Sequence, residues 1–180
     1  MDKALIDNWN QVVTAADMVF IIGDFAWKRA GDYADKLAGT KVLILGSHDK
    51  LNVDDRKRFT GIHDILHTRF GNTWVTLCHY GMSTWPHKQR GAIHLYGHSH
   101  GVMPEDDVYD RRMDVGVDVW GYAPVPWDAI GWYLTSKLPR DPRPESMVQA
   151  TIKRLRARNL ALRTGYDARK GDQNTPHIRA

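Results

Sequence analysis

Cysteine is nearly missing from this sequence, which contains Cys78 and no other in 180 residues. A lone cysteine excludes an internal disulfide and fits a reducing compartment. No apolar stretch approaches the roughly 20 residues of a membrane span, and the first residues lack the apolar segment of a secretory signal. Low-complexity and repeated segments are also missing. We therefore expect a cytoplasmic protein without a membrane partner, in which Cys78 is a small buried apolar residue.

Positive charge is scarce over most of the chain and abundant at its end. Residues 137–180 carry eleven Lys/Arg and four Asp/Glu, whereas residues 1–136 carry fourteen and seventeen. Prolines at 139, 142 and 144 indicate a linker at this change of composition. We expect one globular domain over residues 1–136. Residues 137–180 should form a basic linker, a helix over 145–160 and a disordered tail.

Four short apolar runs each lead into residues that can bind metal or phosphate. Short apolar runs bounded by glycine are typical of buried strands, and ligands of such sheets bind beyond the carboxyl ends of the strands. We therefore expect four strand ends to bring their polar side chains together. The pairs of run and following residues are Met18–Ile22 with Gly23-Asp24, Val42–Leu45 with Gly46-Ser47-His48-Asp49, Trp74–Leu77 with Cys78-His79, and Ile93–Tyr96 with Gly97-His98-Ser99-His100.

The remaining patterns predict an α/β domain in which helices alternate with strands early and strands dominate late. Helices are expected over residues 2–13, 31–37 and 52–59. The Gly71-Asn72 pair predicts a hairpin between strands at 64–70 and 73–78. Two further strands are expected at 113–119 and 130–135.

The polar residues at the strand ends favour a dinuclear metal centre. A carboxylate such as Asp24 can bridge two cations, and neutral imidazoles such as His79 are good metal ligands. His98 and His100 lie two residues apart, so in extended backbone both rings face the same side. His48 could donate a proton to a phosphate oxygen, with Asp49 orienting it. Each motif alone also fits a turn, a cap or a buried histidine, and the prediction depends on their coincidence.

The order Gly-Asp, Gly-Ser-His-Asp, Cys-His-Tyr and Gly-His-Ser-His resembles the calcineurin-like metallophosphoesterase superfamily. The segment from Leu77 to Gly101 and the later Asp114-Val-Gly-Val-Asp118 are especially similar to its small bacterial and phage members. The resemblance covers about residues 2–135. It implies a four-layer α/β/β/α sandwich of two mixed sheets flanked by helices.

The resemblance also implies a role for each site residue and two divalent metal ions, which could be manganese, iron, zinc or nickel. By similarity, Asp24 bridges both metals, and His100 binds the first. His79 and His98 bind the second, to which Ser47 is a further candidate ligand. His48 contacts the phosphate, and Asp49 supports it.

Two departures from the family pattern affect these expectations. The family's first strand ends in Asp-x-His, which supplies ligands to the first metal; this motif is missing and the sequence begins at the helix that follows. The first metal would then keep Asp24 and His100, and only one ion is expected to bind well. Ser47 stands where the family has Asn, whose carbonyl is the better ligand.

The sequence therefore predicts a metal-dependent hydrolase of phosphoesters, either a phosphodiesterase or a phosphomonoesterase. Nucleotides and nucleic acid are among the candidate substrates. One alternative is a truncated or catalytically impaired relative that binds phosphate compounds or a partner protein. Another is a nuclease-like enzyme whose basic tail holds the nucleic-acid backbone.

Overall fold

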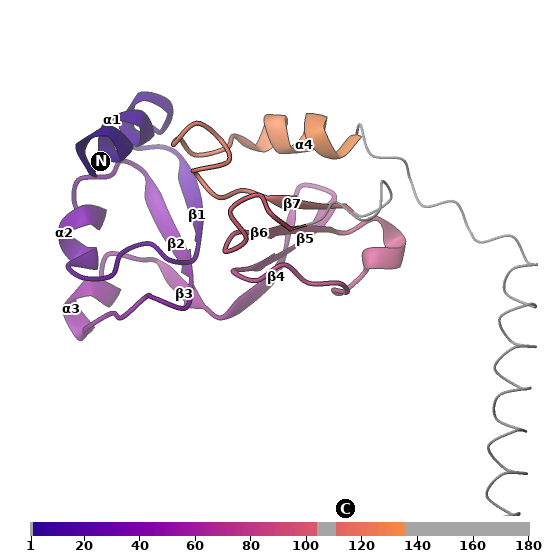
Figure 1. Ribbon diagram of the computed structural model, residues 1–180, viewed down its shortest axis with the longest axis horizontal. Coiled ribbons are helices and arrows are strands. Elements are labelled where there is room, and N and C mark those ends of the chain that lie inside the picture. Colours follow the sequence, from indigo (N-terminus) through magenta and orange to yellow (C-terminus); the bar gives the residue numbers. More distant parts are fainter. Residues whose placement is uncertain (1, 104–110, 136–180) are drawn as a thin grey trace, which may run out of the picture. The chain divides into compact units, whose positions relative to one another are not determined.

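The first of two β-sheets is parallel and carries three helices on one face. It contains β1 (Met18–Ile22), β2 (Thr40–Ile44) and β3 (Gly61–His63) in that order. In this computed structural model, residues 2–103 and 111–135 are described. Helices α1 (Asp2–Val12), α2 (Ala30–Ala34) and α3 (Val53–Arg56) lie on the side of this sheet that faces away from the second sheet (Figure 1).

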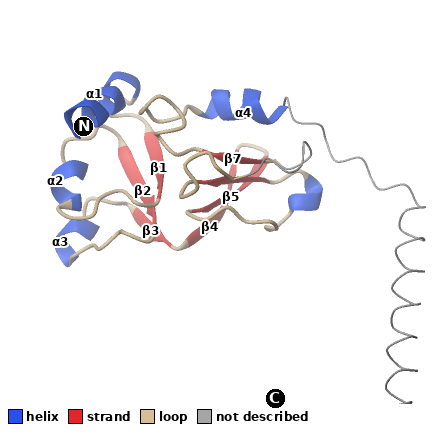
Figure 2. Cartoon of the chain, in the orientation of Figure 1, coloured by secondary structure: helices blue, strands red, loops and turns tan. Residues whose placement is uncertain are grey.

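The second sheet is mixed and begins with a hairpin. Strands β4 (Ile65–Phe70) and β5 (Thr73–Cys78) are antiparallel, and β6 (Ile93–Tyr96) and β7 (Arg112–Asp114) continue the sheet in parallel to β5 (Figure 2). Helix α4 (Trp127–Thr135) packs against β7. No helix in the described part of the chain has both the length and the apolar character needed to cross a membrane.

The alternation of side chains along β2 divides the core into two clusters. Leu43 faces the helices and packs with Ala34 and Phe59. Its neighbour Ile44 points to the other face and joins the larger cluster between the sheets. That cluster also takes residues from β5, β6, β7 and α4, namely Val75, Leu77, Ile93, Leu95, Met113, Ile130 and Leu134. Because successive side chains of a strand point to opposite faces, one strand can serve both clusters.

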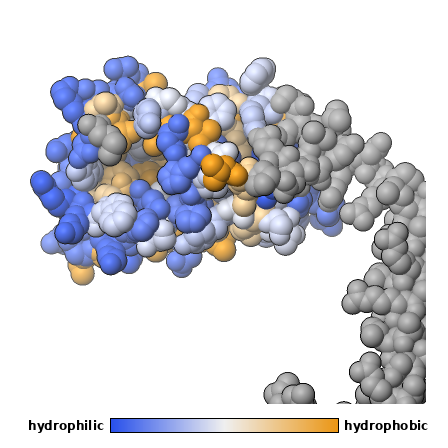
Figure 3. All heavy atoms as spheres, in the orientation of Figure 1, coloured by the Kyte–Doolittle hydropathy of each residue, from blue (hydrophilic) through white to orange (hydrophobic). Residues whose placement is uncertain are grey.

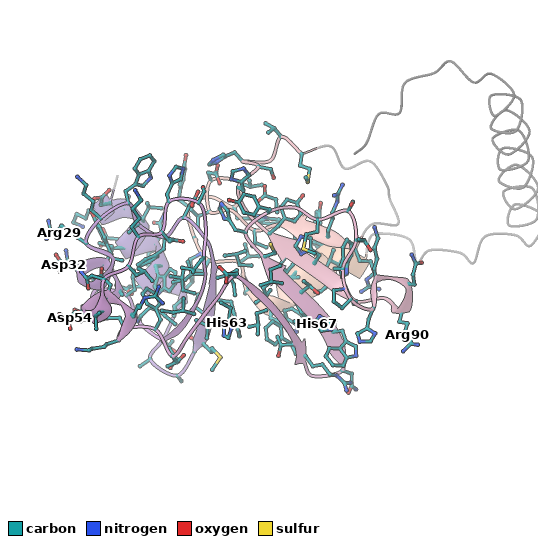
Figure 4. All side chains as sticks on the ribbon, turned by 90° about the horizontal axis from the view of Figure 1, so that it is seen from below. Arg29, Asp32, Asp54, His63, His67 and Arg90 are labelled. Carbon is teal, nitrogen blue, oxygen red and sulfur yellow. The ribbon has the colours of Figure 1, made fainter. Side chains whose placement is uncertain are left out.

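The other face of the second sheet is polar yet buried. Thr76, His94 and Arg112 lie in register on three neighbouring strands, and all three are buried. His67 of β4, which is labelled in Figure 4, continues this row through contact of its Nδ1 with the Thr76 hydroxyl at 2.9 Å. Trp85 lies beside the His94 ring, in the loop between β5 and β6. This loop, which includes the short 3-10 helix Lys88–Arg90, therefore lies over the buried polar row.

Most of the expected elements are present, and the α/β class with two sheets flanked by helices is confirmed. The first helix and the hairpin around Gly71-Asn72 agree with prediction. The helices expected at 31–37 and 52–59 are shorter, at Ala30–Ala34 and Val53–Arg56. The first sheet is parallel rather than mixed in the described residues. The predictions for residues 137–180 lie outside the described residues.

The expected strand at 130–135 is wrong, because this segment belongs to helix α4. Ile130 and Leu134 are four residues apart and both buried, which is the spacing of one helix face. Trp132, between them, is 76% exposed. The expected strand at 113–119 is also too long, since β7 ends at Asp114. In the segment at 130–135 a short apolar run left the choice between periods of two and 3.6 residues open, and after Asp114 the chain turns instead of continuing the strand.

Candidate metal centre

The ends of β1 and β5, from different sheets, meet beside a glycine. Nδ1 of His79 lies 3.0 Å from the carbonyl oxygen of Ile22. Gly23 follows with a φ of +82°, and a Cβ there would lie 2.2 Å from the His79 ring. Only glycine can adopt this backbone conformation and also leave room for the His79 ring. The Gly-Asp pair therefore allows His79 to pack directly against the turn that carries Asp24.

Asp24, His79 and His98 form a cluster at this junction. Each offers one ligand atom, and these atoms all lie within 4.8 Å of one another. Asp24 follows β1, His79 follows β5 and His98 follows β6. One carboxylate and two imidazoles are a ligand set typical of divalent transition metals. The cluster thus brings three of the predicted ligands together from three strand ends and both sheets.

One nitrogen of the His79 ring has no hydrogen-bond partner in the described part of the chain. A carbonyl only accepts hydrogen bonds, so the contact with Ile22 places a ring proton on Nδ1. Nε2 is then the ring atom left to bind a cation or a second proton. It lies 3.3 Å from Oδ2 of Asp24 and, among the described residues, is buried without a hydrogen-bond partner. A lone pair facing a carboxylate is unfavourable unless a cation or a proton lies between them.

Asp49 organises the loops rather than the His48 ring. Its carboxylate accepts hydrogen bonds from the backbone N–H groups of Asp24, Phe25 and Gly46, each at 2.8 Å. The backbone N–H of His48 in turn donates to Oδ1 of Asp24 at 2.9 Å. The partly buried hydrogen bonds of Asp49 therefore hold the backbone that carries Asp24, whereas sequence reasoning assigned Asp49 to orienting His48.

Ser47 and His48 both lie next to Asp24. The hydroxyl of Ser47 lies 3.3 and 3.4 Å from the two carboxylate oxygens of Asp24. The exposed His48 ring stacks on the indole of Trp27, with the ring centres 4.2 Å apart and the planes 10° apart. Sequence reasoning gave Trp27 no role, and its position two residues after Phe25 carries no recognisable signal.

His100 points to a different partner from the one predicted. Its Nδ1 contacts Oδ2 of Asp118 at 2.5 Å, and this hydrogen bond raises the pKa of His100 above its ordinary value. In the described part of the chain, His100 is not a member of the three-residue cluster. Both His98 and His100 have positive φ, whereas the prediction assumed extended backbone with the two rings on the same side.

Asp114 holds the loop that carries His98 and His100. Its carboxylate accepts hydrogen bonds from the hydroxyl of Ser99 and from the backbone N–H groups of Gly101 and Gly116. Asp114 and Asp118 are the two acidic residues of the Asp-Val-Gly-Val-Asp segment. Sequence reasoning noted this segment but gave its residues no function. The structure places both carboxylates against the loop after β6.

The backbone is strained at the site. Six described residues other than glycine have positive φ, and Asp24, His98 and His100 are three of them, at 52°, 65° and 48°. Such conformations cost roughly 1–3 kcal/mol each and persist where the surroundings over-determine them, often at functional sites. The bonds made by Asp49 and Asp114 provide that constraint here.

The known proteins that this chain resembles are consistent with an α/β fold, and those named below have no described activity. No protein-family model matches the chain. The uncharacterized protein MJ1445 of Methanocaldococcus jannaschii is 30% identical over 139 residues, covering 72% of this chain and 73% of that protein. The Gene 66 protein of Mycobacterium phage D29 is 27% identical over 161 residues, covering 72% and 80%. The crystal structure of the protein of unknown function AQ665 from Aquifex aeolicus has a TM-score of 0.59 at 20% identity and covers 73% of this chain and 84% of that one.

The fold and the cluster define an α/β sandwich of two sheets with a candidate metal centre where the strand ends meet. Within this class, the chain belongs to the family of the uncharacterized protein MJ1445, with which it shares most of its length.

Proposed function

We propose that Asp24, His79 and His98 bind a divalent transition metal and that the chain hydrolyses phosphoesters at this centre. The observation that carries the proposal is the buried Nε2 of His79, which faces the Asp24 carboxylate without a hydrogen-bond partner in the described residues. A metal ion would remove this unfavourable contact by binding both atoms. The resemblance of the four strand-end motifs to metallophosphoesterases supports the same chemistry.

The residues around the cluster suit a phosphate group. When bound, divalent metals lower the pKa of a water nucleophile and neutralise the charge on phosphate oxygens. His48 lies beside Asp24 with its ring exposed, where it can donate a hydrogen bond to a phosphate oxygen or to the leaving group. Asp49 holds the backbone of both loops and so positions Asp24 and His48 together.

The alternative, an impaired relative that binds phosphate compounds, is favoured by one observation. His100 is paired with Asp118 rather than grouped with Asp24. Of the predicted ligands for a first metal, Asp24 alone then lies in the cluster. We therefore expect one well-bound metal ion and slow turnover.

Calorimetric titration with manganese, together with hydrolysis of bis(p-nitrophenyl) phosphate, tests the proposal. Wild-type protein should bind one equivalent and turn over slowly. Asp24→Asn should abolish both, because the amide keeps the size of the side chain but removes its negative charge. Two tight equivalents with rapid turnover would contradict the single-metal expectation, and the absence of any binding would overturn the proposal.

Ser47→Asn provides a further variant of the same site. An asparagine carbonyl extends further than a hydroxyl and is a better neutral ligand, and the Ser47 hydroxyl already lies beside Asp24. Manganese affinity should therefore increase. Equal affinities of the two proteins would show that residue 47 is not a ligand.

A further inference from the structure

Trp27 is a large aromatic side chain placed on the surface next to the candidate metal centre. Its residue is 71% exposed, although an indole normally buries most of its area. One face of the indole stacks on the His48 ring. With a nearly parallel ring on one side and this exposure, the opposite face of the indole is open to solvent.

The stack is tied directly to the metal cluster. Trp27 lies three residues after Asp24 in the sequence, and its partner His48 donates its backbone N–H to the Asp24 carboxylate at 2.9 Å. A flat ligand on the open face of Trp27 would therefore lie close to a phosphate bound at the cluster.

A second exposed aromatic residue contacts the cluster. Tyr80 is 48% exposed, and its ring contacts those of His79 and His98 edge-on, at centre distances of 5.0 and 4.8 Å. Trp27 and Tyr80 come from loops that follow strands of different sheets. The surface seen in Figure 3 is mostly hydrophilic.

We propose that Trp27 is a stacking platform for the base of a nucleotide phosphoester whose phosphate binds at Asp24, His79 and His98. This inference rests on the proposed function and names its substrate class. Bases stack on aromatic side chains with little dependence on sequence, because every base has a flat π face. The exposed Lys28 follows Trp27 in the sequence and adds positive charge to the same loop.

Two p-nitrophenyl phosphodiesters, one with a nucleoside and one with a methyl group as the second ester, test the proposal. The p-nitrophenyl ester of thymidine 5′-monophosphate and methyl p-nitrophenyl phosphate release the same product, but only the first carries a base. Wild-type protein should have a KM at least about 5-fold lower for the nucleotide ester, the lower end of base stacking energies. Trp27→Ala should bring the ratio of the two KM values to about 1, and Trp27→Phe should retain part of the preference; the ratio is the readout because loss of the stack on His48 affects both substrates alike.

Trp132→Ala is the matched control, since Trp132 is similarly exposed, at 76%, but lies on α4. This variant should keep the wild-type preference, and the melting temperatures of all three variants should match that of the wild type. An unchanged preference in Trp27→Ala would overturn the proposal.

A binding measurement separates this proposal from the proposed function. If neither ester is hydrolysed, the hydrolase is refuted, and calorimetric titration with thymidine 5′-monophosphate and with methyl phosphate still tests the stacking. The wild type should bind the nucleotide at least about 5-fold more tightly than methyl phosphate. Trp27→Ala should bind the two compounds with equal affinity. Equal binding of both compounds to the wild type would overturn the stacking itself.

Discussion

At the scale of single residues, the site combines strained backbone with side chains held by the loops around them. Asp24 takes a left-handed conformation while Asp49 binds its N–H, and His98 does so in a loop held by Asp114. Left-handed conformations of residues other than glycine are unfavourable in isolation. The surrounding hydrogen bonds and the packing of the core offset the free-energy cost of these conformations.

Substitutions of His98 test this strain, because the residue is exposed and has a φ of 65°. His98→Gly should keep the free energy of unfolding within about 1 kcal/mol of wild type, since glycine adopts this conformation readily. His98→Val should be less stable than His98→Gly by at least ~1 kcal/mol, because a branched Cβ clashes there. Urea unfolding of both variants gives the comparison, and both should lose metal binding. Equal stabilities would show that the backbone at residue 98 is not held left-handed.

At the scale of elements, the second sheet depends on a buried polar row. His94 of β6 is fully buried, and its Nδ1 contacts the carbonyl oxygen of Thr76 while its Nε2 accepts from the backbone N–H of Met82. The ring thereby fastens the segment that follows His79 to the sheet. Burial lowers the pKa of His94 below its ordinary value.

This lowered pKa predicts a specific dependence of stability on pH. Between its folded pKa and its unfolded pKa of about 6.5, His94 binds more protons in the unfolded chain than in the folded one. The contribution of His94 to the free energy of unfolding is therefore complete above about pH 6.5. It is lost as the pH falls toward the folded pKa, at up to ~1.4 kcal/mol per pH unit. His94→Gln keeps a donor and an acceptor but does not titrate in this range.

The measurement is urea unfolding of wild type and His94→Gln between pH 7.5 and 5, a range chosen around the value of about 6.5 for free histidine. The difference in free energy of unfolding between wild type and His94→Gln should become smaller as the pH falls. Titration of the other histidines cancels in this difference, because both proteins contain them. Parallel curves for the two proteins would show that His94 does not remain neutral in the folded state.

At the scale of the whole described domain, the candidate metal centre joins the two sheets. Asp24 follows a strand of the first sheet, and His79 and His98 follow strands of the second. The core between the sheets, built around residues such as Ile44, Leu77 and Leu95, brings these strand ends within reach of one ion. A bound metal would therefore act on global stability as well as on chemistry.

Metal binding should raise the melting temperature by mass action. At a free manganese concentration 100 times Kd, a single site that exists only in the folded state contributes about 2.7 kcal/mol. Calorimetric melting with and without manganese measures this shift, and a chelator should reverse it. Asp24→Asn should show no shift, whereas Trp132→Ala should behave as wild type. An equal shift in Asp24→Asn would place the ion elsewhere.

The sequence by itself determined the strands and the residues at their ends. Apolar runs bounded by glycine are local signals, so β1, β2, β5 and β6 were found near their true bounds, as was the hairpin at Gly71-Asn72. Because the runs end at polar residues and parallel strands share a carboxyl edge, the closeness of His79 and His98 could also be predicted, whereas the approach of Asp24 depends on how the two sheets pack.

Tertiary structure decided the features that depend on contacts between distant segments. The backbone of His98 and His100 is left-handed, and the loop that carries them is held by Asp114 and Asp118, more than ten residues away. Helix α4 forms where Ile130 and Leu134 find the core between the sheets, although the same residues also fit a strand. The stacking of Trp27 on His48 joins two loops whose proximity follows only from the pairing of β1 with β2. Local patterns specify which residues end a strand, but the direction of each side chain there depends on hydrogen bonds and packing from other parts of the chain.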